Sequence, residues 1–176
     1  TDYHFLQNGI EGDKIEHLLI THSHGDHFYP TELFLRTPPY AHEMRVPELT
    51  VHGNKKICDS IAARGDCKNV RLAPIAPFES VEFGRYKVTA LPARHAFGEG
   101  ALFYIIEGDK TLLYAHDTGY FYDEVFDFIA EHGLRFDLAS FDCTNVDIPI
   151  SDEGTHMGFP NIERVLDKLS SIGAIT

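Results

Sequence analysis

The stretch KIEHLLITHSHGDH, residues 14–27, is the most informative part of this 176-residue chain. Its first half, residues 14–21, holds the apolar run Leu18, Leu19 and Ile20, which predicts a buried β-strand. Its second half changes abruptly to polar residues, with three histidines and one aspartate inside six positions. A buried strand that leads directly into such a cluster indicates a functional site at the end of the strand.

The polar side chains of this stretch have the chemistry and spacing of a metal site. Neutral imidazoles and carboxylates are ligands that zinc and similar divalent ions prefer. In an extended segment, residues two apart point the same way, so His22 and His24 can bind one ion. A turn eased by Gly25 lets Asp26 and His27 face a second ion. The alternative is a polar surface loop with chance histidines, and this spacing after an apolar strand argues against it.

The rest of the chain mixes strand and helix patterns and has two hairpins near its middle, at residues 84–85 and 108–110. Residues 37–47 contain three prolines and predict an irregular loop. This mixture predicts a single α/β sandwich domain over residues 1–176, not a purely parallel sheet. The expected strands are residues 14–21, 49–52, 70–75, 81–83, 86–91, 101–107, 111–114, 137–141 and 173–176, and the expected helices are residues 31–36, 55–64, 122–132 and 160–171.

Composition excludes several classes of protein. A hydrophobic fraction of 43% and a charged fraction of 24% are typical of an ordinary globular domain. The apolar runs are strand-sized, so no membrane span or signal peptide is expected, and we predict a cytoplasmic protein. A net charge of −12 repels polyanions, so long nucleic acid is a poor candidate partner and a small molecule is a better one. Cys58 and Cys67 could pair, but reduced thiols are the simpler interpretation of Cys58, Cys67 and Cys143.

The motifs resemble those of a known superfamily. His22, His24, Asp26 and His27 are similar to the His-x-His-x-Asp-His signature of the metallo-β-lactamase superfamily, including the preceding Leu-Leu-Ile-Thr. Further along, His95 in LPARH and Asp117 in LYAHDTG resemble the histidine and the bridging aspartate of its later motifs. The resemblance covers nearly the whole chain, and it implies an αββα sandwich that holds two metal ions.

The resemblance also assigns the ligands. It implies that His22, His24 and His95 bind the first metal, that Asp26 and His27 bind the second, and that Asp117 bridges both. The expected ions are Zn²⁺, with Mn²⁺ or Fe as alternatives. The superfamily's initial strands and its last ligand, a histidine after a late Thr, are absent from residues 1–176. We therefore expect the chain to be the interior of a longer protein, with that histidine just beyond Thr176.

A finer resemblance concerns Asp142-Cys143-Thr144 and His156, which are similar to residues of the phosphodiesterase branch of the superfamily. That branch includes the carbon–phosphorus-lyase phosphodiesterases and RNase Z, and it carries a non-ligand histidine that assists the leaving oxygen. The resemblance implies this role for His156, whereas the spacing alone equally suits a helix cap. Asp26 and His156 are thus the expected catalytic residues. Asp142 is either a residue that orients a metal-bound histidine or a plain strand-end carboxylate.

The expected function is metal-assisted hydrolysis of a small phosphodiester, cyclic or linear, by a protein that is a candidate homodimer. Lactones, thioesters and β-lactams are alternative substrates, and a non-catalytic metal-binding or sensor module is an alternative class. The other histidines lack partner spacing. We expect His116 to point away from the ligands and the remainder to be surface groups, namely His4, His17, His42, His52 and His132.

Overall fold

The computed structural model describes residues 2–65 and 68–175. The chain divides into two compact units, Thr1–Pro74 and Ile75–Thr176, which are described separately. The first unit contains α1 (Asp2–Gln7), the 3₁₀ helix η1 (Gly12–Lys14), β1 (His17–Leu19), α2 (Thr31–Phe34), β2 (Leu49–Gly53), α3 (Lys55–Ala62) and β3 (Val70–Pro74). The second contains β4 (Ser80–Phe83), β5 (Tyr86–Pro92), β6 (Leu102–Glu107), β7 (Thr111–Ala115), α4 (Asp123–Glu131), β8 (Leu138–Phe141) and α5 (Phe159–Ser171).

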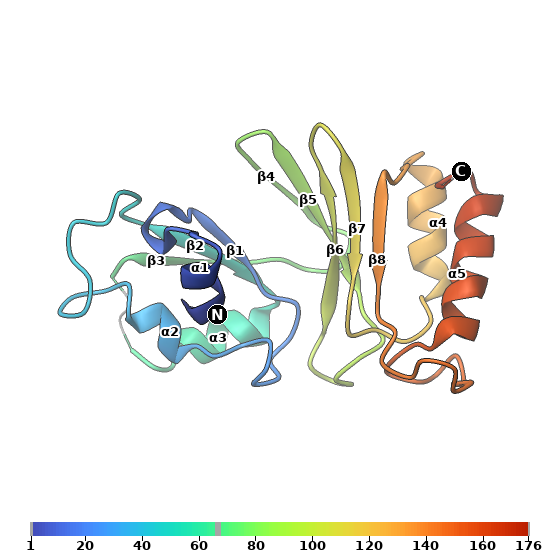
Figure 1. Ribbon diagram of the computed structural model, residues 1–176, viewed down its shortest axis with the longest axis horizontal. Helices are drawn as coiled ribbons and strands as arrows, with labels where there is room; N and C mark the ends of the chain where they lie inside the picture. The colour runs from blue at the N-terminus through green and yellow to red at the C-terminus, as the bar shows by residue number, and fades with distance from the viewer. Residues whose placement is uncertain (1, 66–67, 176) are drawn as a thin grey trace. The chain divides into compact units, whose positions relative to one another are not determined.

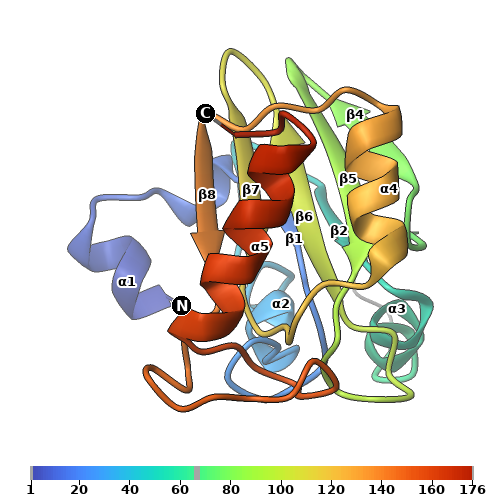
Figure 2. The same cartoon turned by 90° about the vertical axis from the view of Figure 1, so that its right-hand side faces the viewer.

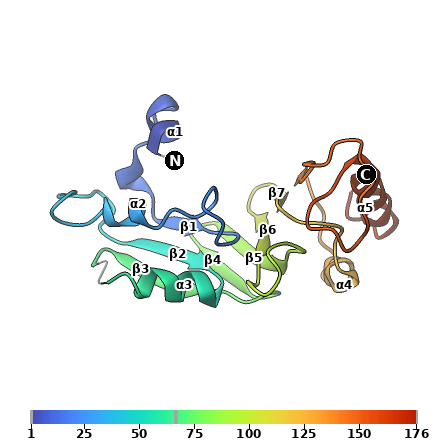
Figure 3. The same ribbon diagram turned by 90° about the horizontal axis from the view of Figure 1, so that it is seen from below.

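The first unit is built on a parallel three-stranded sheet in the order β1-β2-β3. The register pairs Leu18 with Val51 and Val51 with Leu72, so apolar side chains line one face. Helix α3 runs beside β2 and β3 (Figure 3), and its Ile57 is fully buried in the same apolar cluster. Asn54 caps α3 by accepting a hydrogen bond from the Ile57 backbone N–H at 2.9 Å. This core fixes the strand that leads into His22.

The second unit is built on a five-stranded sheet in the order β4-β5-β6-β7-β8 (Figure 1). Strand β6 is antiparallel to β5 and to β7, and β7 is parallel to β8. Helices α4 and α5 lie across one face of this sheet (Figure 2), where Phe103 stacks on Phe121 with ring centroids 4.8 Å apart. Strands β5, β7 and β8 therefore run in the same direction. The carboxyl ends of these three strands therefore lie at the same end of the sheet, and so do the residues that follow them.

The α/β class is confirmed, with differences in the elements near both ends of the described chain. The strand expected at residues 14–21 is shortened to β1, because Lys14 ends the 3₁₀ helix η1. Helix α1 was not expected, because residues 2–7 lack a clear apolar period. The strand expected at residues 173–176 is absent from residues 173–175, and Thr176 lies outside the described residues. Gly173 instead adopts a φ of 75°, and the Ala174 N–H bonds to the Leu169 carbonyl at 2.9 Å. These residues end α5 in a Schellman motif and are not available for a strand.

The prediction that His17 and His52 are surface groups was wrong. His52 is only 4% exposed, because it lies on the central strand β2, and its Nε2 is 3.0 Å from Nδ1 of half-buried His17. Burial, followed by the charges of His17 and Arg71, lowers the pKa of His52. A central strand is covered from both sides, and that position is not visible in the local sequence.

Two further expectations concern the cysteines and the membrane. Cys58 is a buried free thiol, and the pairing considered with Cys67 falls on a residue outside the described ranges. Among residues 2–65 and 68–175, no helix has the length and apolar character that a membrane span requires.

Candidate metal centre

In the first unit, the expected ligands lie in the segment that follows β1. The ring of His22, which is 1% exposed, lies 4.6 Å from the ring of His24 and 4.3 Å from that of His27. The amides of His27 and Phe28 both donate to the His24 carbonyl, at 3.0 and 2.8 Å. This tight turn after the extended His22-Ser23-His24 segment gathers three imidazoles within one small volume, as the spacing predicted.

The orientation of His22 is set by its neighbour. Thr21 Oγ1 lies 3.0 Å from His22 Nδ1, so Nε2 is the nitrogen that a cation would use. Asp26, whose side chain is 79% exposed, has its Oδ2 3.5 Å from His27 Nε2. The first unit thus offers three imidazoles and one carboxylate from six consecutive residues.

In the second unit, His95 and Asp117 lie where β5 and β7 end. His95 is 6% exposed and donates from Nδ1 to the carbonyl of Thr155 at 3.0 Å, assigned on the tautomer that makes this bond. Its Nε2 is then 3.9 Å from Oδ2 of Asp117. Two atoms that each lie about 2.0–2.2 Å from one ion are at most about 4.3 Å apart, so this separation permits a shared ion. Asp117 itself has a left-handed φ of 50°, a strained conformation that directs its carboxylate.

His156 is held by Asp142, which follows β8. His156 Nδ1 and Asp142 Oδ2 are 2.6 Å apart, and Asp142 is only 2% exposed. Burial acts to raise the pKa of Asp142, but hydrogen bonds from the Thr144 N–H and from His156 outweigh it, so the pKa lies below its usual range. Asp142 therefore remains a carboxylate that fixes the orientation and tautomer of the His156 ring.

His156 is not a helix cap. The N-cap of α5 is Gly158, whose N–H donates to the Asn161 side chain at 3.2 Å. The imidazole of His156 instead faces the site: its Nδ1 is 3.9 Å from Asp117 Oδ1, and its ring is 4.7 Å from the His95 ring. Asp117, Asp142 and His156 each offer a ligand atom within 4.8 Å of the others.

A close glycine contact fixes the segment that carries His156. A Cβ on Gly119 would lie 1.8 Å from the carbonyl oxygen of Gly154, far inside any real contact. Only glycine at position 119 lets the segment after Asp117 touch the segment before Thr155 and His156. The orientation of His95 and the position of His156 therefore depend on the same short turn.

Comparison with known proteins agrees with these motifs. Residues 4–174 match the model of the beta-lactamase superfamily domain, which is nearly the whole chain. The chain belongs to this family. A curated relative, a UPF0173 metal-dependent hydrolase of Carboxydothermus hydrogenoformans, is 30% identical over 129 residues, or 66% of this chain and 51% of the relative. The chain thus spans about half the length of that relative.

Solved structures show the same fold. The metallo-beta-lactamase fold protein YhfI from Bacillus subtilis matches with a TM-score of 0.71 at 15% identity, over 96% of this chain and 66% of that one. A diphosphatase from the PhnP family matches with a TM-score of 0.67 at 19% identity, over 99% of this chain and 64% of that one. The α/β elements are therefore those of the metallo-β-lactamase fold.

The donor atoms of this beta-lactamase superfamily domain fit divalent cations. They are imidazole nitrogens and carboxylate oxygens, and the orienting contacts of His22 and His95 are those that metal-bound histidines usually have. Sequence reasoning missed the Thr155 carbonyl, because a backbone acceptor has no residue signature. Asp142 was expected either to orient a metal-bound histidine or to be a plain strand-end carboxylate, and its observed partner is His156.

The other residues near the motifs have structural contacts. Arg94 donates from Nε to the Tyr120 carbonyl at 3.0 Å, and its guanidinium lies 4.0 Å over the Tyr122 ring. His116 Nε2 is 2.6 Å from Ser140 Oγ on the neighbouring strand. Phe121 is 2% exposed and belongs to the core. These contacts give Arg94 and Phe121 packing roles.

Proposed function

We propose that this chain carries the dinuclear metal centre of a hydrolase that cleaves small phosphodiesters. In this proposal His22, His24 and His95 would hold one ion, Asp26 and His27 would hold the other, and Asp117 would contribute to both. Zinc is the proposed metal, with manganese or iron as alternatives, because imidazole and carboxylate donors suit all three. When bound, two such cations supply an activated water and stabilise negative charge on the substrate oxygens.

The observation that carries the phosphodiester assignment is the Asp142–His156 pair. Its 2.6 Å hydrogen bond engages Nδ1 of His156, so the opposite nitrogen, Nε2, is the atom that can carry a transferable proton. A phosphodiester has an alkoxide leaving group that benefits from a proton, which general acid catalysis provides. His156 protonates that oxygen as the P–O bond breaks. Throughout the reaction, Asp142 accepts a hydrogen bond from the Nδ1–H of His156. This bond keeps the imidazole ring in one tautomer.

The remaining residues of the second unit act by positioning. The Thr155 carbonyl holds His95 with Nε2 directed towards Asp117, and the strained backbone at Asp117 places its two oxygens between His95 and His156. In the first unit, the exposed carboxylate of Asp26 is accessible to water and is the proposed acceptor of a proton from it. Two solved proteins of similar fold, a diphosphatase from the PhnP family and yeast PDE1, support a phosphorus–oxygen substrate.

The assignment is tested by comparing substrate classes with metal-loaded protein. We expect hydrolysis of bis-p-nitrophenyl phosphate and little hydrolysis of a lactone or a thioester, with two divalent ions per chain by metal analysis. Preferential lactone or thioester cleavage would move the assignment to those substrates. A protein that binds metal but hydrolyses none of the three would indicate a binding or sensor module.

His156→Ala provides the sharper test. Its metal content should equal that of the unaltered protein, and hydrolysis of an alkyl diester with a poor leaving group should slow by roughly 100-fold or more. A nitrophenyl leaving group needs little protonation, so that substrate should be affected much less. Equal loss on both substrates, or loss of metal, would show that His156 is not the acid.

A further inference from the structure

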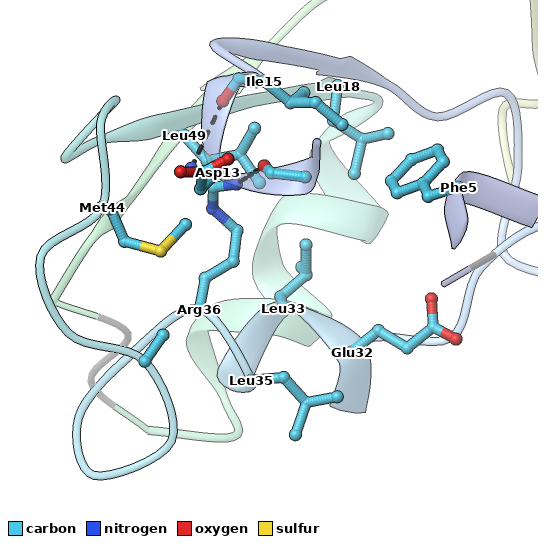
Figure 4. A pocket seen from close by; sticks show the side chains of 12 residues that line it. Phe5, Asp13, Ile15, Leu18, Glu32, Leu33, Leu35, Arg36, Met44 and Leu49 are labelled. Atoms are coloured by element: carbon cyan, nitrogen blue, oxygen red, sulfur yellow. Dashed lines mark hydrogen bonds between the residues drawn. The ribbon is translucent and has the colours of Figure 1, made fainter. Parts of the chain in front are cut away.

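The first unit contains an apolar cavity of about 310 Å³ close to the metal motif (Figure 4). It lies between α1, η1, α2 and the loop that precedes β2. Its lining is mainly hydrocarbon, with Leu18 and Leu33 facing one another across it and Phe5 to one side (Figure 4). Its volume is at the small end of the range for ligand pockets, so it suits a short chain or a single ring.

The charged residues of the cavity wall have partners within the protein. The Arg36 guanidinium donates to the backbone carbonyls of Gly12, Ile15 and Val46. The Asp13 carboxylate accepts two hydrogen bonds from Arg45, at 2.6 and 2.7 Å. Since these groups are engaged in closing the loops around the cavity, the space itself offers apolar surface. A charged ligand group would lose its hydration in this mainly apolar space.

A second, smaller cavity lies beside this one and is lined by a residue of the segment 22–27. It has a volume of about 140 Å³ and is lined by His27 together with Phe28 and Tyr29. Leu18, Glu32 and Leu33 line both cavities, so the two are neighbours that share a wall. Apolar side chains therefore line both the cavity beside the proposed ligand His27 and the larger cavity next to it.

We propose that the substrate carries a short apolar group, an alkyl chain or a single aryl ring, that enters these cavities while its phosphate lies at the metal centre. This inference rests on the proposed function and specifies its substrate class as a phosphodiester of an apolar alcohol. The apolar lining favours alcohols that bury more apolar surface when they bind. His27 lies at the end of the smaller cavity that is nearest the reacting phosphate. Strongly polar diesters, such as cyclic nucleotides, would leave the cavities unused.

A series of 4-nitrophenyl alkyl phosphates tests the inference with metal-loaded protein. The leaving group is constant and only the alkyl chain grows, from methyl to butyl to hexyl. We expect kcat/KM to rise by about fourfold per added methylene until the cavity is filled, the ratio that corresponds to ~0.8 kcal/mol per buried CH₂. Equal kcat/KM for the three substrates would overturn the inference and leave the proposed function intact.

A cavity-filling variant and a matched control test where the alkyl chain of the substrate binds. Met44→Trp should keep activity on the methyl diester and abolish the gain with chain length, because Met44 lines the larger cavity. Tyr40→Trp, in the same loop but 71% exposed and outside the lining, should retain the gain. A full gain in Met44→Trp would place the alkyl chain elsewhere and overturn the inference.

Binding measurements separate this inference from the proposed function. Calorimetry with methylphosphonate and hexylphosphonate reports affinity without turnover. Tighter binding of hexylphosphonate that Met44→Trp abolishes would support the cavity even in a protein that hydrolyses no diester. Equal affinities for the two phosphonates would count against it.

Discussion

Replacing Gly119 by alanine should disable the second unit's half of the site from a position that bears no functional group. The new Cβ would lie 1.8 Å from the Gly154 carbonyl oxygen and 3.2 Å from Arg94 Cδ. Relief to the shortest contact that real Cβ atoms show, 3.0 Å, requires the turn at Gly154 to move by about 3.0 − 1.8 = 1.2 Å. The turn has little free space of its own, because a Cβ on Gly154 would lie 2.2 Å from Ile150 Cγ2.

The consequences follow from the two residues after Gly154. A displacement of about 1.2 Å breaks the 3.0 Å hydrogen bond from His95 to the Thr155 carbonyl, and it moves His156 away from Asp117. Misplacement of about 1 Å in a catalytic group costs about 100-fold in rate. Overpacking of this kind also lowers the free energy of unfolding by about 1–3 kcal/mol.

The assay is hydrolysis of methyl 4-nitrophenyl phosphate with metal analysis and denaturant unfolding. Gly12→Ala is the matched control, because its Cβ would meet only Phe5, at an ordinary 3.7 Å. We expect Gly119→Ala to lose about 100-fold in kcat/KM and Gly12→Ala to remain within twofold. Full activity in Gly119→Ala would show that the turn does not position His95 and His156.

Three other changes have defined outcomes. Asp142→Asn removes the charge from a buried hydrogen bond, so the free energy of unfolding should fall by about 1.5–3 kcal/mol in denaturant titrations, and an unchanged value would contradict the structural role of the pair. Because the pKa of His52 is lowered in the folded protein, the unfolded chain binds a proton below about pH 6.5 that the folded chain does not. The free energy of unfolding should therefore fall from pH 7 to pH 5. Its dependence on pH should be shallower in His52→Asn. An identical slope in both proteins would rule out His52 as the source. Ile129→Ala should cost about 2–5 kcal/mol, because Ile129 is fully buried against the second sheet, and a loss under 1 kcal/mol in thermal or denaturant unfolding would mean that this core is not tightly packed.

The features that the sequence predicts well are those with a local pattern. The strand at Leu18, the hairpin at Gly84 and the turn that gathers His22 and His27 each follow from periodicity or spacing within a few residues. The Schellman motif at Gly173 also had a local signal, a glycine directly after a helix, which was outweighed by the apolar residues around it.

The features that the sequence misses depend on partners far along the chain. Asp142 and His156 lie 14 positions apart, at the two ends of an irregular loop, and Thr155 acts on His95 through a backbone atom 60 positions away. The burial of His52 depends on β2 being the central strand, which is a property of the assembled sheet. Spacing proposed the candidate ligands within residues 22–27 and the family resemblance added His95 and Asp117, whereas the contacts that orient these side chains required the fold.

The central proposal is that six residues, His22, His24, Asp26, His27, His95 and Asp117, hold two metal ions. The most direct measurement is a crystal structure of the metal-loaded protein with anomalous diffraction data at the metal's absorption edge. We predict two anomalous peaks about 3.5–4 Å apart, bound by His22, His24 and His95 at one ion, by Asp26 and His27 at the other, and bridged by Asp117. Peaks bound by residues of only one unit, or Asp117 bound to neither ion, would contradict the claim.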